Sequence, residues 1–129
     1  MASGLPAATG DVLTAATVNG LVTFTVSSDQ TADYTAVLTD QYQTLVVMNK
    51  ATAVAFKIPT DASVNFAVGT AITIYNKGAG AVTVSAVTSG TTTVVSAGAV
   101  SAAPTLAQYK SAACIKTGTD TWYVVGAIG

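Results

Sequence analysis

The chain has 129 residues, of which 50% are hydrophobic and only 9% are charged. Its charged side chains are five lysines and six aspartates, with no arginine, glutamate or histidine, and the formal net charge is -1. Without histidine the chain lacks the usual general base near neutral pH and the commonest metal ligand. Without arginine, a slightly acidic chain has no counterion-release drive towards nucleic acid. We therefore expect no enzyme activity, no cofactor or metal, and no nucleic-acid partner.

The low charge also bears on the surface of the protein. Ordinary soluble domains carry about 25% charged residues, and a surface with a net charge near zero tends to associate. Two interpretations are open. Threonine and serine hydroxyl groups could keep such a surface in solution, or the protein could work inside a large assembly. We favour the assembly.

The chain begins with residues 1–20, which we predict to form an N-terminal arm ahead of a β domain at residues 21–129. Residues 14–19 fit one or two helical turns, with Thr14 as the cap and Gly20 as the terminator. The alternative is a frayed terminus, as is common at the ends of domains. We expect the apolar residues of this segment to lie at an interface with another subunit: Leu5, Leu13, Val18 and Leu21.

The same segment bears on targeting. It has no positively charged region followed by an apolar run, which argues against a secretory signal. No stretch of the chain approaches the roughly 18–20 apolar residues that a membrane span needs. We expect a protein that is made in the cytoplasm and does not enter a membrane.

Residues 21–129 predict a single all-β domain, because β-branched residues dominate, with 22 Thr, 18 Val and 5 Ile against six Leu. Short alternating runs with breaks every 8–12 residues are typical of an antiparallel β-sandwich or a jelly roll of about nine short strands. The runs lie at residues 21–27, 35–38, 45–49, 54–58, 71–76, 81–86, 91–96, 106–110, 112–116 and 121–127.

Two of the breaks resemble tight turns. The runs AITIYN and AVTVSA flank Lys77-Gly78-Ala79-Gly80, and this pattern predicts a β-hairpin. The last two runs are joined by Thr117-Gly118-Thr119-Asp120, which is also a good turn sequence.

The cysteine and the aspartates could be catalytic or metal-binding residues, or they could stabilise the fold. Cys114 is the only cysteine and lies in an apolar stretch, which favours a small buried side chain over a nucleophile. Calcium prefers clustered oxygen ligands, but the nearest pair of carboxylates is Asp29 and Asp33, with no third acid beside them. We expect turn hydrogen bonds from all six aspartates, with a loop calcium site or a glycosidase pair of carboxylates as alternatives: Asp11, Asp29, Asp33, Asp40, Asp61 and Asp120.

The aromatic residues could serve a core or a ligand. Trp122 and Tyr123 are neighbours on the last predicted strand, so they point to opposite faces and only one of them can be in the core. Exposed aromatic rings could stack on sugars, whereas core packing and subunit contact are the ordinary uses of Tyr and Trp. We favour the core and subunit interpretation.

Several stretches together resemble a known family. GDVLTAATVNGL resembles the GxxLTAAxxN opening of many small phage virion proteins. The segments TD followed by LVVMN, IPTDASV, VGTAITIYNKGAG and GTDTW are similar to a domain that recurs in tailed-phage appendage and head proteins. The resemblance implies a structural protein of the virion, and its motifs are structural rather than catalytic.

The resemblance and the low charge lead to one expectation for function. A single sandwich with an arm has no shaft with which to build a long fibre, which favours a capsid decoration or cement protein that binds the major capsid protein. We expect a homotrimer located in the virion. The subunit interface expected at Leu5, Leu13, Val18 and Leu21 would then be a contact within the trimer or with the capsid. The alternative is a tail, fibre or neck component that binds a host glycan.

Overall fold

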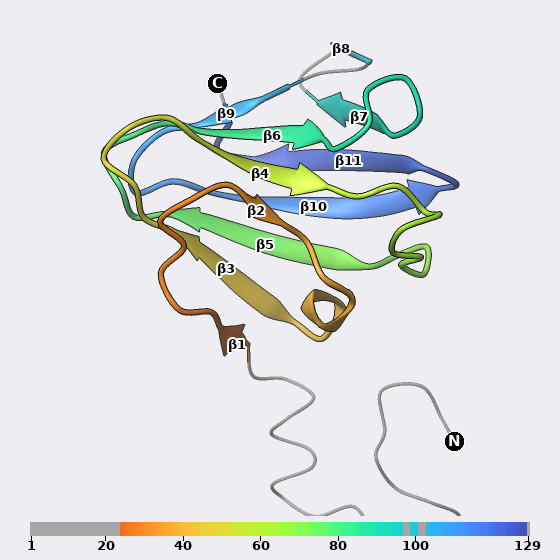
Figure 1. The fold of residues 1–129 in the computed structure, drawn as a ribbon, viewed down its shortest axis with the longest axis horizontal. Coiled ribbons are helices and arrows are strands. Elements are labelled where there is room, and N and C mark those ends of the chain that lie inside the picture. The colour runs from red at the N-terminus through yellow and green to blue at the C-terminus, as the bar shows by residue number, and fades with distance from the viewer. Residues whose placement is uncertain (1–23, 97–98, 101–102, 129) are drawn as a thin grey trace, which may run out of the picture.

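The computed structural model describes residues 24–96, 99–100 and 103–128. These residues form two β-sheets and one short 3-10 helix, η1 (Leu38–Gln41), as Figure 1 shows. The seven-stranded sheet has the order β1-β3-β5-β10-β11-β7-β8, with β1 (Thr25–Val26), β3 (Thr44–Met48), β5 (Ala71–Asn76), β7 (Thr93–Ser96), β8 (Ala99–Val100), β10 (Ser111–Gly118) and β11 (Thr121–Gly126). The four-stranded sheet has the order β2-β4-β6-β9, with β2 (Tyr34–Thr35), β4 (Val54–Ile58), β6 (Val82–Ala86) and β9 (Thr105–Leu106).

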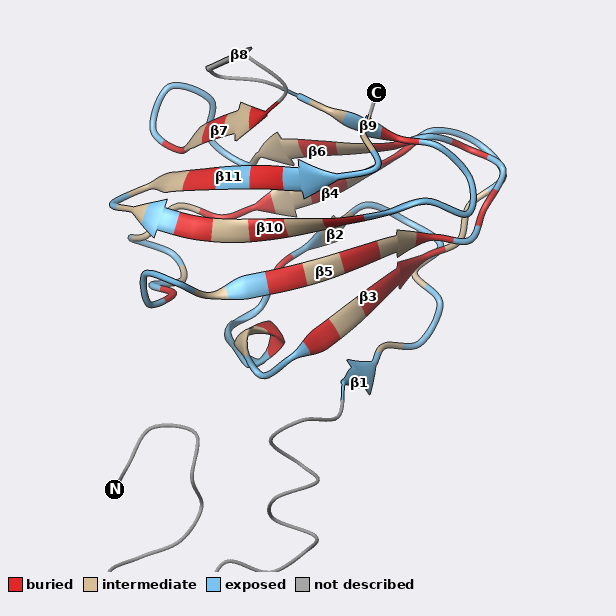
Figure 2. Ribbon diagram, turned by 180° about the vertical axis from the view of Figure 1, so that it is seen from behind, coloured by how far each residue is buried: buried red, intermediate tan, exposed pale blue. Residues whose placement is uncertain are grey.

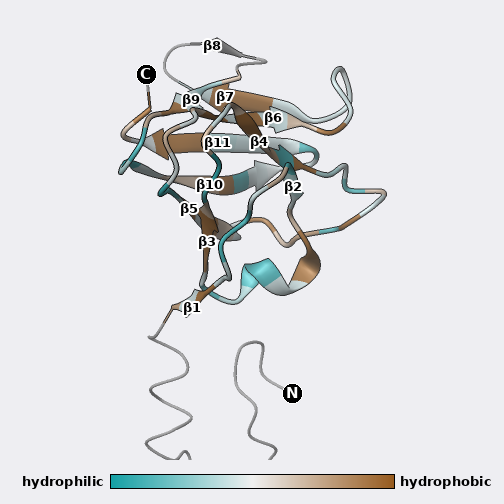
Figure 3. Cartoon of the chain, turned by 60° about the vertical axis from the view of Figure 1, so that its left-hand side comes forward, coloured by the Kyte–Doolittle hydropathy of each residue, from teal (hydrophilic) through white to brown (hydrophobic). Residues whose placement is uncertain are grey.

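One hydrophobic core draws side chains from both sheets. Alternate residues of β5 and β10 and the first part of β11 are buried, which gives the red bands separated by tan or pale blue along these strands in Figure 2. Phe56 of the four-stranded sheet and Trp122 of the seven-stranded sheet are among the largest fully buried side chains. Figure 3 shows the matching hydrophobic colour on β3 and β7. The expected all-β domain is confirmed as a mostly β structure with two sheets.

Strand direction departs from the antiparallel prediction. The pairs β1/β3, β3/β5, β2/β4, β4/β6 and β7/β11 are parallel, whereas β5/β10, β10/β11, β6/β9 and β7/β8 are antiparallel. Four of the five parallel pairs, all except β7/β11, arise because the chain alternates between the two sheets from β1 to β6. Each odd strand and the even strand that follows it form a β-arch, in which the two strands belong to different sheets and face each other through side chains. Successive arches stack through the parallel pairs, as in solenoid proteins.

The predicted hairpin at residues 77–80 is wrong for the same reason. β5 pairs with β3 and β10, and β6 pairs with β4 and β9, so the segment between them crosses from one sheet to the other. Its main chain lies on the preceding arch, where Lys77 N donates to Met48 O at 2.8 Å and Gly80 N donates to Lys50 O at 2.9 Å. A Cβ atom at Gly80 would collide with the backbone of Thr52. The glycines here therefore permit close stacking of arches and do not form a hairpin turn.

The second turn prediction is confirmed. β10 and β11 are antiparallel neighbours, with Cys114 opposite Val124 and a register irregularity between Lys116 and Gly118. Asp120 in the connecting turn has a positive φ of 45°. This hairpin lies in the middle of the seven-stranded sheet and places Lys116 at one end of the core.

Two predicted strands are shorter than expected. The run at 35–38 gives way to η1 after β2, and the run at 106–110 leaves the sheet after Leu106, where Tyr109 adopts a positive φ of 64°. The proposed arm and its helical turns lie outside the described residues. Within the described part of the chain, no helix has the length and apolar character needed to cross a membrane.

Candidate functional site

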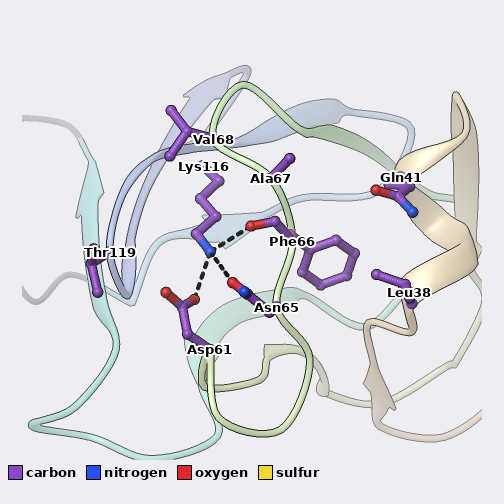
Figure 4. A pocket seen from close by; sticks show the side chains of 9 residues that line it. All are labelled: Leu38, Gln41, Asp61, Asn65, Phe66, Ala67, Val68, Lys116 and Thr119. Carbon is purple, nitrogen blue, oxygen red and sulfur yellow. Dashed lines mark hydrogen bonds and ion pairs between the residues drawn. The ribbon is translucent and has the colours of Figure 1, made fainter. Parts of the chain in front are cut away.

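The most concentrated polar arrangement in the described residues surrounds the ammonium group of Lys116. Inward positions of β10 alternate as Ala112, Cys114 and Lys116, so the lysine enters the core from its own strand. Its Nζ atom donates to Asp61 Oδ1 at 2.7 Å, to the Phe66 carbonyl at 2.6 Å and to an Asn65 side-chain oxygen at 3.4 Å, as Figure 4 shows. The lysine side chain is 3% exposed, and the Asp61 side chain is 20% exposed.

The carboxylate of Asp61 also joins the segment after β4 to the β10–β11 turn. Asp120 N donates to Asp61 Oδ2 at 3.0 Å, and Asp61 N donates to Asp120 Oδ1 at 2.8 Å. Burial alone raises the pKa of Asp61, but the hydrogen bonds from Lys116 and from the Asp120 amide outweigh it and lower the pKa below its ordinary value of 3.8. The group is therefore held as a carboxylate beside a cation.

This arrangement closes one end of the core. The segment between β4 and β5 carries Phe66, whose ring is 1% exposed and packs against Trp122 edge to face with ring centroids 5.4 Å apart. Lys116 holds the carbonyl of the same Phe66. All three donors of the ammonium group have an acceptor. We call Lys116, Asp61, Asn65, Phe66 and Asp120 the latch.

A cavity of about 540 Å³ lies beside the latch. Leu38 of η1 and Val68 stand on its rim, and they are 49% and 67% exposed. Figure 4 shows Lys116 and Asp61 at one side of the cavity, with Gln41 on the helix across from them. The charges in the wall already pair with each other. The rest of the lining mixes apolar side chains with polar ones, so the cavity offers a ligand both kinds of contact: Leu38, Phe66, Ala67 and Val68, and Gln41, Asn65 and Thr119.

The second candidate site is the outer surface of the seven-stranded sheet, which faces the viewer in Figure 2. Outward hydroxyl groups lie towards the ends of this sheet, at Tyr75 and Ser111 and at Thr93 and Thr121. Between them, two rows of outward side chains cross the sheet in register. One row contains Val26, Leu45, Thr73, Ala113 and Val125, and the other contains Ala71, Ile115, Tyr123 and Val95. We call these nine residues the apolar face. Lys116 is the only charged residue in β1, β3, β5, β7, β10 and β11, and it points inward.

The outer surface of the four-stranded sheet has the opposite character. Its outward rows are Thr35, Lys57 and Ser85, and Ala55, Thr83 and Thr105. Lys57 Nζ lies 3.8 Å from Asp33 Oδ2 with the lysine side chain 40% exposed. A surface of hydroxyl groups and one ion pair is well hydrated. The apolar face is not, so burial against a partner would stabilise the apolar face more than the outer surface of the four-stranded sheet.

The residues that the sequence singled out have mixed outcomes. Leu5, Leu13, Val18 and Leu21 lie outside the described residues. Cys114 is fully buried, and burial raises the pKa of its thiol to about 12, as its apolar surroundings predicted.

The described aspartates accept hydrogen bonds, as the turn interpretation predicted, but several of their partners lie far away in the sequence rather than in the same turn. Asp40 accepts from Val37 N, three residues away. Asp33 instead accepts from Ala55 N, and Asp29 accepts from Asn49 and Lys77 side chains, so both join distant segments. Among the residues that the structure describes, no group of three or more metal-ligating side chains comes together.

The aromatic prediction is confirmed for the last strand, where Trp122 is 1% and Tyr123 is 46% exposed. Trp122 therefore cannot present its ring to a sugar in this structure. The other strongly exposed rings, Phe24, Tyr42 and Tyr109, lie on separate segments of the chain.

Sequence reasoning missed the latch. The inward alternation of Ala112, Cys114 and Lys116 could have identified the lysine as a core residue, but nothing local named Asp61 as its partner. Comparisons with models of protein families, with curated proteins and with solved structures find no match to this chain. The likeness to phage virion proteins therefore stays a prediction.

Proposed function

We propose that this chain is a structural protein of a bacteriophage virion, and that it acts as a capsid decoration or cement protein. The observation that supports the proposal is the contrast between the apolar face and the hydroxyl-rich surface of the other sheet. A charge-free surface across six strands tends to associate and is typical of an interaction site. Its neighbours would be the major capsid protein or other virion subunits.

The latch is consistent with a mechanical role. A decoration protein must keep its shape while it bridges neighbouring subunits, and the latch fixes the end of the core through a buried cation. Each bridging contact would be stabilised by apolar burial of about 25 cal/mol per Å², less the cost of ordering. The two sheets fit the sandwich expected from the sequence. The parallel pairs argue against a jelly-roll winding, which belongs to the antiparallel architectures.

The alternative is a tail, fibre or neck component with host-glycan binding. The burial of Trp122 removes the aromatic residue that made this alternative most testable. The homotrimer expected from the sequence stays a prediction, and the two-fold contact proposed below competes with it.

Gold-labelled antibodies against the purified chain test the proposal on virions purified from cells that express the gene. Label spread over the head supports a decoration protein, and label confined to the tail or neck supports the alternative. Particles that lack the chain, both by labelling and by mass spectrometry of the purified particles, would show that the proposed function is wrong.

A further inference from the structure

The outer surface of the seven-stranded sheet carries an inference about the nearest neighbour of this protein. We propose that the apolar face binds the same face of a second copy, so that two sheets pack face to face around a two-fold axis. The inference rests on the proposed function in that it names one neighbour within the particle. It is tested on the purified chain, where no other virion protein is present.

The first argument is the chemistry of the face. Val125 and Tyr123 are 49% and 46% exposed, and they lie on the strand next to the half-buried Ala113 and Ile115 of β10. The outward positions combine aliphatic, aromatic and threonine side chains, with no charge. Two such faces can meet without desolvating an ion and without like-charge repulsion, whereas a charged partner would leave its ions unpaired against them.

The second argument is symmetry. A two-fold contact places the same patch on both sides, and a patch without charges is complementary to itself. The surface of the four-stranded sheet does not have this property, because Lys57 and Asp33 would each face desolvation there. The geometry therefore favours pairing through the seven-stranded sheet over a contact between its face and the opposite surface of the next copy.

The third argument is size. Six strands about 4.8 Å apart, each with about 5 residues at about 3.3 Å per residue, give a face of roughly 29 by 17 Å. The projected area is about 500 Å² per copy, or about 1,000 Å² for the pair, which is at the lower limit for specific interfaces. We therefore expect a weak dimer, with a dissociation constant in the micromolar range.

Sedimentation equilibrium of the full-length chain across roughly 1 µM to 1 mM tests the inference, with the range set by the affinity expected for so small an interface. The expected result is a monomer–dimer equilibrium. A charge on an exposed position of the face, in Tyr123→Lys, should weaken dimerisation at least about tenfold. The matched control is Thr83→Lys, which adds the same charge to the outer surface of the four-stranded sheet and should leave the equilibrium unchanged. Circular dichroism of both variants establishes that they are folded.

If another partner binds the apolar face, the same experiments give different results. A trimer, or a monomer over the whole range, overturns the inference but leaves the virion role open, since the face could then bind the shell. Equal weakening by Tyr123→Lys and Thr83→Lys also overturns it, because the contact would not be specific to one face. If Leu13→Asp abolishes the dimer, the N-terminal segment and not a second face is the partner. A dimer of a chain that is absent from particles would refute only the function.

Discussion

Replacement of Lys116 by methionine tests the latch directly. Methionine has a similar length and is apolar, so Lys116→Met keeps the packing volume and removes the ammonium group. The variant loses the three hydrogen bonds that the ammonium group donates, at 2.6 to 3.4 Å. It also leaves the Phe66 carbonyl without its donor and the Asp61 carboxylate without its counter-charge.

The expected loss follows from burial. Removal of one partner of a buried ion pair typically costs about 3–5 kcal/mol. Lys116 is 3% exposed at its side chain, but Asp61 is 20% exposed and keeps the hydrogen bond from Asp120 N. Part of the remaining charge can therefore be hydrated, which places the loss near about 3 kcal/mol. At about 4 °C per kcal/mol for a chain of this size, the melting temperature should fall by about 12 °C.

Urea denaturation measures this loss, with circular dichroism and the fluorescence of Trp122 as probes. The matched control is Lys57→Met, which breaks an exposed pair at 3.8 Å and should cost less than about 1 kcal/mol. The double variant Lys116→Met/Asp61→Asn no longer contains an unpaired charge and should recover at least about 1 kcal/mol relative to Lys116→Met. A loss below about 1 kcal/mol in Lys116→Met, or no recovery in the double variant, would refute the latch as a buried ion pair.

Three further predictions concern acid, the thiol and the arch loops. The native pKa of Asp61 lies below its ordinary value of 3.8, so its stabilising contribution is present above that pH and is lost as the pH falls further. The stability advantage of the wild type over Asp61→Asn, from urea titrations at pH 6 to 2, should therefore narrow below about pH 4. Cys114 should react with a thiol reagent only as the chain unfolds, so rapid labelling of native protein would contradict its burial. Gly80→Ala should lower the free energy of unfolding by about 2 kcal/mol or more because of the clash with Thr52. Gly118→Ala, where the nearest atom is 4.0 Å away, should change it by less than about 0.5 kcal/mol in the same titrations.

Strand positions could be predicted because alternation is a local property. The runs at residues 54–58 and 71–76 coincide with β4 and β5, and the opposite exposures of Trp122 and Tyr123 follow from the same period of two. The burial of Cys114 follows from its apolar neighbours. Each of these predictions needs only a few residues on either side.

Strand partners could not be predicted in the same way. An alternating run followed by a short glycine loop and a second run has the same pattern in a hairpin and in a β-arch. What separates them is the segment on which the loop stacks, and for residues 77–80 that segment is 50–52. The Asn-Lys pair recurs at Asn49-Lys50 and Asn76-Lys77, but Asn76 lies opposite Met48, so the repeat is one residue out of register with the stacked arches.

The structure shows where the few charged residues of the chain lie. Lys57, Lys77 and Lys116 pair with Asp33, Asp29 and Asp61. Each pair joins segments far apart in the sequence, so these charges mainly organise the ends and loops of the sheets. Charged residues are therefore unevenly distributed, and the outward positions of β3, β5, β10 and β11 have none. A solvated surface of hydroxyl groups accounts for the four-stranded sheet. It does not account for the apolar face, which has Thr73 but otherwise consists of Val, Leu, Ile, Ala and Tyr.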